Sequence, residues 1–138
     1  MRWRVVPAFL VGFMVAACQT APSAPSTPPT QALAPAPADL PAQYARFYGA
    51  WSGKWDNVWD VTLVLDKISN TGFADGQYYW KEHVPGPWRH ETLSGQIRGD
   101  SVLLGDMITI TLDLTEPTKA EAVGKFPTVT RRAPLTRL

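Results

Sequence analysis

Hydrophobic and polar residues alternate with a period of two along most of the chain after residue 43. The pattern is clearest in three stretches, in which the apolar positions are Val61, Leu63 and Leu65, then Ile108, Ile110, Leu112 and Leu114, then Ala122, Gly124 and Phe126. A period of two is typical of β-strands that bury one face. Turn-forming residues separate the stretches at 69–72, 85–87 and 99–100. We therefore expect short strands near 50–56, 58–67, 73–82, 89–98, 101–106, 107–114, 119–126 and 129–137.

Strands of this length, joined by tight turns, predict an all-β fold. The expected architecture is a small antiparallel up-and-down meander of about eight strands that closes into a barrel and so leaves no exposed edge. A two-sheet sandwich is the alternative. Only the stretch 40–47 is expected to form a helical turn, with Pro41 well placed at its start.

The residues before this domain predict export and a flexible connection. Residues 1–17 have the form of a secretory signal, with Arg2 and Arg4 followed by an apolar run, Val5 to Val15, that is too short to span a bilayer. Residues 18–42 are rich in Pro, Ala, Ser and Thr and contain no aromatic residue, which is typical of an extended tether. The expected domain boundaries are therefore 1–17, 18–42 and 43–138.

The segment Val15-Ala16-Ala17-Cys18 resembles the bacterial lipobox. This resemblance implies that Cys18 receives a diacylglycerol and, after cleavage, a further acyl chain such as palmitate, so that the mature protein is a lipoprotein anchored in the cell envelope. Gln19 after the cysteine resembles outer-membrane sorting, with the domain facing the periplasm or the cell surface. An ordinary signal peptide cleaved after Ala17 and a short uncleaved membrane anchor are the alternatives.

Composition narrows the possible functions. The chain has 13 Lys and Arg, two of them in the signal, against 12 Asp and Glu, so the mature chain is close to neutral and nucleic acid is not an expected partner. Cys18 is the only cysteine, which excludes an internal disulfide. No nucleophile elbow, phosphate loop or zinc signature is present in the sequence, so we expect a protein that is not an enzyme and needs no cofactor.

The start of the domain, Gly49-Ala50-Trp51-Ser52-Gly53-Lys54-Trp55, resembles the Gly-x-Trp opening of calycin barrels, the lipocalin-like group, in which a Trp plugs one end of the barrel. Trp51 and Trp55 fall on the same face of a strand by parity. The opening strand and the closing stretch Arg132 to Arg137 also resemble small bacterial envelope domains of uncharacterised role. These resemblances imply a fold and no activity.

The candidate site residues flank the turn Pro85-Gly86-Pro87. Trp88 lies in this loop, where an exposed aromatic side chain can stack on a sugar ring or anchor a partner protein. Its neighbours are Glu82, His83, Arg89, His90 and Glu91. If Glu82 and Glu91 faced each other across a hairpin, two Glu and two His would meet, a set able to hold a divalent metal. A solvated loop neutralised by Lys81 or Arg89 is the simpler interpretation, and we assign no metal.

Two further features have simple structural explanations. Arg98-Gly99-Asp100 spells an adhesion tripeptide, but Gly99-Asp100 lies between two strand patterns and is expected to form a hairpin turn. Basic residues gather near the C-terminus and form either a solvated strand face or a patch for an anionic envelope polymer or lipid: Lys119, Lys125, Arg131, Arg132 and Arg137.

Together these observations predict a lipid-anchored envelope protein whose barrel binds a glycan, a small apolar ligand or a protein partner without catalysis. The alternative function is inhibition of a lysozyme-type or protease-type enzyme through a protruding loop at 85–88. A hollow barrel would favour a ligand-binding protein, and a filled barrel with a protruding loop would favour an inhibitor.

Overall fold

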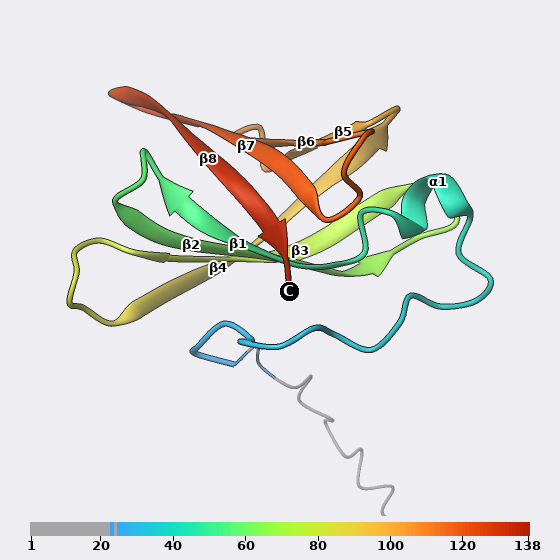
Figure 1. The fold of residues 1–138 in the computed structure, drawn as a ribbon, viewed down its shortest axis with the longest axis horizontal. Coiled ribbons are helices and arrows are strands. Elements are labelled where there is room, and N and C mark those ends of the chain that lie inside the picture. Colours follow the sequence, from blue (N-terminus) through green and yellow to red (C-terminus); the bar gives the residue numbers. More distant parts are fainter. Residues whose placement is uncertain (1–22, 24) are drawn as a thin grey trace, which may run out of the picture.

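The computed structural model describes residue 23 and residues 25–138, which form a closed antiparallel barrel of eight strands in sequential order (Figure 1). The all-β, up-and-down barrel expected from the sequence is confirmed, and the sandwich is excluded. The elements are α1 (Ala42–Ala45), β1 (Gly49–Trp55), β2 (Trp59–Ile68), β3 (Phe73–Lys81), β4 (Trp88–Arg98), β5 (Ser101–Leu104), β6 (Ile108–Leu112), β7 (Lys119–Phe126) and β8 (Val129–Arg137). The structure is consistent with a calycin-like barrel.

Two hairpin turns show why the chain reverses where it does. Asp56 and Asn57, between β1 and β2, have φ angles of 48° and 60°, a left-handed conformation that Asp and Asn tolerate better than most residues. Gly99 has a φ of 61° and precedes Asp100, and Arg98 pairs directly with Ser101. The adhesion tripeptide is therefore the turn between β4 and β5, as expected.

The barrel closes between β1 and β8 through a short ladder. Only Trp51, Ser52 and Gly53 pair with β8, and the ladder stops at Pro134, which has no N–H to donate. Beyond the proline, Asp56 forms the contacts with β8. Its backbone N–H donates to the carbonyl of Arg132 over 2.8 Å, and its carboxylate accepts from the Arg132 N–H over 3.2 Å. The first hairpin turn thus completes the closure.

The barrel interior is filled with side chains. The large, fully buried members are Trp51, Phe47, Leu63, Leu65, Leu104, Ile108, Ile110 and Leu135. The predicted stripe of β6 is correct for Ile108, Ile110 and Leu112 but wrong for Leu114, which lies beyond the strand and is 68% exposed. The turn at Gly105–Met107 likewise makes β5 and β6 shorter than predicted.

Residues 25–40 lie along the outside of the barrel, as the blue segment of Figure 1 shows. Leu33 packs against a small apolar cluster on the outer face of β1, β2 and β3, formed by Ala50, Val64 and Tyr79. The hydroxyl of Tyr79 donates to the carbonyl of Pro25 over 3.1 Å. This part of the expected tether therefore covers the reverse face of one wall of the barrel.

The predicted signal and Cys18 lie outside the described residues. Among the residues that are described, no helix has the length and apolar character needed to cross a membrane.

Candidate functional site

The conditional arrangement in which two Glu and two His would meet across the hairpin is not assembled. Strand register pairs Glu91 with Tyr78 and His90 with Tyr79, so Glu82 does not face Glu91 across the hairpin. Because successive residues of a strand point to opposite faces, His90 and Glu91 also lie on opposite sides of β4. In the part of the chain that the structure describes, no group of three His, Cys, Asp or Glu side chains is placed to hold a metal ion.

Trp88 is not an exposed loop residue, which corrects the sequence-based expectation. It is the first residue of β4, pairs with Lys81 of β3 and is half-buried. Its ring packs against the outer apolar cluster, and the Lys81 ammonium lies 4.9 Å from the ring centroid. The next residue, Arg89, forms an exposed ion pair with Glu82 at 3.0 Å. The exposed apolar side chain of this loop is instead Val84, at 55%.

A concave site lies at the mouth of the barrel formed by the β1–β2, β3–β4, β5–β6 and β7–β8 turns. Its volume is about 390 Å³, within the range of small-ligand sites. Aromatic side chains from four strands or their ends form most of its wall, and four charged side chains lie among them or at the rim. The lining residues are Trp55, Trp59, Tyr78, Trp80, Met107 and Phe126, with Lys81, Glu82, Glu91 and Arg131. We call this site the mouth cavity.

The floor of the mouth cavity is held rigid by contacts between rings. The indole N–H of Trp55 donates to the hydroxyl of Tyr78 over 3.0 Å. Tyr78 stacks on Trp80, with centroids 4.7 Å apart and ring planes inclined by 16°. Trp55 meets Phe126 edge to face, at 5.8 Å and 89°. Trp55 is only 2% exposed, so these contacts seal the filled interior below and leave the partly exposed rings of Trp59 and Trp80 facing the opening.

The charged groups of the mouth cavity differ in how they are paired. Arg131 donates to Asp56 at 2.7 Å, and its guanidinium lies 4.1 Å from the centroid of the Trp59 ring. Lys81 lies 3.7 Å from Asp60, and Glu82 is paired with Arg89. Glu91, by contrast, forms no ion pair with any residue that the structure describes. Its carboxylate is available to a ligand.

Burial changes the chemistry of the tyrosine below these charges. Desolvation raises the pKa of Tyr78 to about 12; the hydrogen bond from Trp55 opposes this rise, and the Glu91 carboxylate adds to it. The hydroxyl is therefore neutral across the physiological range. It serves as a hydrogen-bonding group of the cavity floor and not as a base.

Sequence reasoning placed Glu82 and Glu91 near the site but missed Trp59, Met107, Phe126 and Arg131. These residues lie at or beside turns far apart in the chain. In an up-and-down barrel, alternate turns lie at the same end, so the turns after β1, β3, β5 and β7 could have been grouped from the predicted strand order alone. The lengths of the strands, which determine where the cavity opens, could not have been predicted from the strand order.

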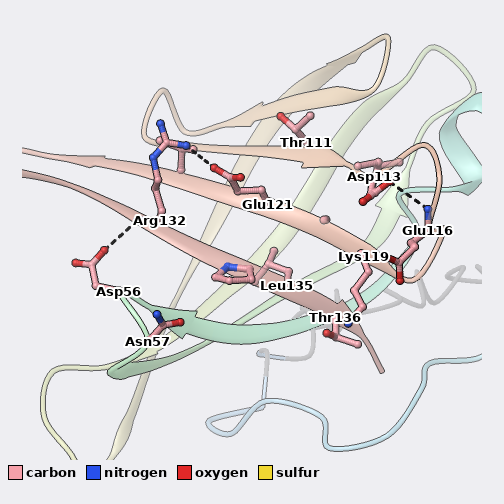
Figure 2. Close-up of a pocket in the computed structure, with 14 residues that line it drawn as sticks. Asp56, Asn57, Thr111, Asp113, Glu116, Lys119, Glu121, Arg132, Leu135 and Thr136 are labelled. Atoms are coloured by element: carbon pink, nitrogen blue, oxygen red, sulfur yellow. Dashed lines mark hydrogen bonds and ion pairs between the residues drawn. The ribbon is translucent and has the colours of Figure 1, made fainter.

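A second, larger concavity lies on the outer face of β6, β7 and β8 (Figure 2). Its volume is about 1030 Å³, and its wall is a mixture of polar and apolar groups. Three of the charged side chains that line it have partners within the protein: Arg132 pairs with Glu121, and Asp113 accepts from the backbone N–H groups of Thr115 and Glu116 at 2.7 and 3.1 Å. Together with the Thr115 hydroxyl, these bonds lower the pKa of Asp113. None of the residues that line the groove is aromatic, in contrast to the mouth cavity.

The C-terminal basic residues do not form one patch. Arg131 lies over Trp59 in the mouth cavity, Arg132 pairs with Glu121 on the outer face, and Arg137 lies 4.4 Å from the centroid of Trp51. Each of these three arginines therefore has a separate structural partner, and Arg131 and Arg132 lie on opposite faces of β8 because faces alternate along a strand.

Comparisons with models of protein families, with curated proteins and with solved structures gave no match.

Proposed function

We propose that this protein is a lipid-anchored binding protein of the bacterial cell envelope, without catalytic activity, and that its ligand is an envelope glycan held in the mouth cavity. The observation that carries the proposal is the cavity itself, an aromatic cup with a charged rim at the open end of a filled barrel. The lipid anchor at Cys18 rests on the lipobox resemblance.

The shape of the site favours a sugar over an apolar ligand. Sites for apolar small molecules bury most of the ligand surface, which in a barrel requires a hollow interior. Here the interior is occupied by buried side chains, so a ligand can only lie across the mouth. The rings of Trp59 and Trp80 offer flat apolar surfaces there, and Glu91 and Arg131 offer an acceptor and a donor for hydroxyl and amide groups.

The test is isothermal titration calorimetry with soluble peptidoglycan fragments and with the oligosaccharide part of lipopolysaccharide. Trp80→Ala and Trp59→Ala should each weaken binding at least about 10-fold, equivalent to 1.4 kcal/mol. Trp88→Ala is the matched control because it removes the same side chain outside the cavity, and it should keep the affinity of the wild-type protein. Equal loss in all three variants, or no binding of either glycan, would contradict the proposal.

The second candidate function is inhibition of an envelope enzyme by the β3–β4 hairpin. The observation in its favour is that this hairpin extends beyond the rest of the barrel, at the left of Figure 1, and carries the exposed Val84 at its loop. A filled barrel with a protruding loop is the geometry expected of an inhibitor. Inhibition of a lysozyme that is lost in Val84→Asp but kept in Trp80→Ala would favour this function over glycan binding.

A further inference from the structure

One edge of β4 is unpaired over half of the strand. β4 has 11 residues and its neighbour β5 only 4, and the two strands pair only at Ile97–Val102 and Arg98–Ser101. One further bond joins the N–H of Gly105 to the carbonyl of Ser94 over 2.9 Å. Beyond it, the chain turns away into β6, and no strand of the described chain lies beside residues 88–93. About 20 Å of strand is thus left without a neighbour.

The backbone groups at this edge can be identified from the two flanking bonds. The N–H of Ile97 points to β3, where it donates to Gly72 over 2.8 Å, and the carbonyl of Ser94 points to β5. Because these directions alternate along an antiparallel strand, the N–H and C=O groups of Trp88, His90 and Thr92 all point away from β3. They form a template for one more strand.

Exposure is consistent with a gap beside this stretch of β4, at the mouth of the otherwise closed barrel. Arg89 and Glu91 share the inward parity of Leu93 and Ile97, yet both are exposed, whereas Leu93 and Ile97 are buried. The gap lies next to the mouth cavity, which Glu91 lines.

We propose that this edge pairs with the same edge of a second copy of the chain, antiparallel about a two-fold axis at His90. The free stretch runs from Trp88, where the β3–β4 loop ends, to Thr92, the last outward-pointing residue before Ser94, and His90 is its centre. A two-fold axis at His90 sets Trp88 opposite Thr92 of the second copy and pairs every free backbone group of the stretch.

The charges of Arg89 and Glu91 favour a second copy of the chain over another strand at this edge. In the proposed register, Arg89 lies directly opposite Glu91 of the second copy, and the symmetry repeats the pair. Inward-pointing charges usually protect an edge from other strands, since a random partner leaves them unpaired. Here the order Arg89-His90-Glu91 makes the edge complementary to itself. Arg89 gives up only an exposed ion pair with Glu82, which contributes little. The Glu91 carboxylate has two oxygens, so it can accept from Arg89 of the second copy through one and from a ligand of the mouth cavity through the other.

The test is disulfide trapping in bacterial membranes with the full chain. Residues that face each other in a hydrogen-bonded antiparallel pair have Cα atoms about 5.5 Å apart, within disulfide range. His90→Cys should therefore form a covalent dimer with mild oxidant, at a yield about ten times that of Lys67→Cys, an exposed control on β2. The wild-type chain, with Cys18 alone, reports any background.

Charge exchange separates this dimer from random collision. In the His90→Cys chain, Glu91→Arg should reduce the dimer to the control level by placing two pairs of like charges opposite each other. The double change Arg89→Glu with Glu91→Arg should restore it. Absence of the dimer, a yield insensitive to Glu91→Arg, failure of the double change to restore the yield, or trapping of a different protein would each overturn the proposal. Glycan binding by a chain that stays monomeric would leave the proposed function standing.

Discussion

The indole N–H of Trp55 and the hydroxyl of Tyr78 meet at 3.0 Å between β1 and β3, directly below the mouth cavity. Both residues are buried, and Tyr78 is 4% exposed. The bond therefore lies where the filled interior ends and the cavity begins, and it fixes the tyrosine ring on which Trp80 stacks.

Removing the hydroxyl with Tyr78→Phe should lower the free energy of unfolding by about 1–3 kcal/mol, because the buried Trp55 N–H then has no acceptor. Urea unfolding monitored by tryptophan fluorescence measures this change. Tyr44→Phe is the matched control, since Tyr44 is half-buried and its hydroxyl forms no hydrogen bond with the described residues. An equal loss of unfolding free energy in both variants would mean that the bond between Trp55 and Tyr78 does not contribute to stability.

The same tyrosine should make stability fall at high pH. Its pKa is about 12 in the folded protein, against 10.0 ordinarily. The folded state thus holds the proton more tightly than the unfolded state, so the stabilisation is complete below pH 10 and is lost as the pH rises toward 12. Because burial also raises the pKa of Tyr79, absorbance of tyrosinate near 295 nm should show more than one late-ionising tyrosine, and Tyr78→Phe should remove one of these late steps. A late step of unchanged amplitude in Tyr78→Phe would place the high pKa on another residue.

The two classes of tryptophan should differ in their effect on stability. Trp51 is fully buried and donates to the carbonyl of Phe47 over 3.0 Å, so Trp51→Ala should cost about 3–5 kcal/mol. Trp88 covers only the outer apolar cluster and is half-buried, so Trp88→Ala should cost about 1–2 kcal/mol. Thermal melts of the two variants measure the difference, and equal costs would make Trp88 part of the main core.

Much of the fold could be predicted from the sequence because each signal is local. The period-two stripes identify the buried faces of β2 and β6, and Gly99-Asp100 identifies a turn from the chemistry of positive φ. The pairing around Pro85-Gly86-Pro87 could not be predicted. The loop spans residues 82–87, so Lys81 pairs with Trp88 and Tyr78 with Glu91. A prolyl turn has no single length, and a shift of register changes every facing pair.

The mouth cavity was harder to predict because it depends on the difference in length between β4 and β5. It opens where β4 continues and β5 has ended. β5 ends at Leu104, and the next residue, Gly105, has a φ of 56° and turns the chain. The sequence pattern runs nearly unbroken through this turn, from Val102 to Leu112, so it predicted longer strands. Trp59 and Arg131 were missed because each contacts a partner from another hairpin.

The lipid anchor can be tested independently of the barrel. Cys18→Ser should abolish lipid attachment, because a hydroxyl does not replace the thiol that accepts the diacylglycerol, and one or more acyl chains are what hold such a protein to a membrane. Metabolic labelling with a fatty acid analogue and membrane fractionation measure the outcome. The expected result is an unlabelled chain that stays as precursor or leaves the membrane fraction. Labelling that survives the substitution would contradict the anchor.

The close approach of β1 and β8 at Gly53 predicts that a larger residue at this position destabilises the barrel. A Cβ atom added there would lie 2.1 Å from the carbonyl oxygen of Pro134 and 3.0 Å from a methyl group of Leu135. The oxygen belongs to the backbone of β8, so it cannot move aside as the end of a flexible side chain can. Gly53→Ala must therefore push β1 and β8 apart within their three-residue ladder, and overpacking of this kind costs about 1–3 kcal/mol.

Ser52→Ala, at the neighbouring position of the same ladder, should cost less than about 0.5 kcal/mol. Urea unfolding measures the free energy of unfolding of the two variants. In Gly53→Ala, amide hydrogen exchange should show that protection is lost first in β1 and β8. A Gly53→Ala protein as stable as Ser52→Ala would mean that the two strands can separate freely at this point and that the bonds of Asp56 and Leu138 on either side of the ladder close the barrel.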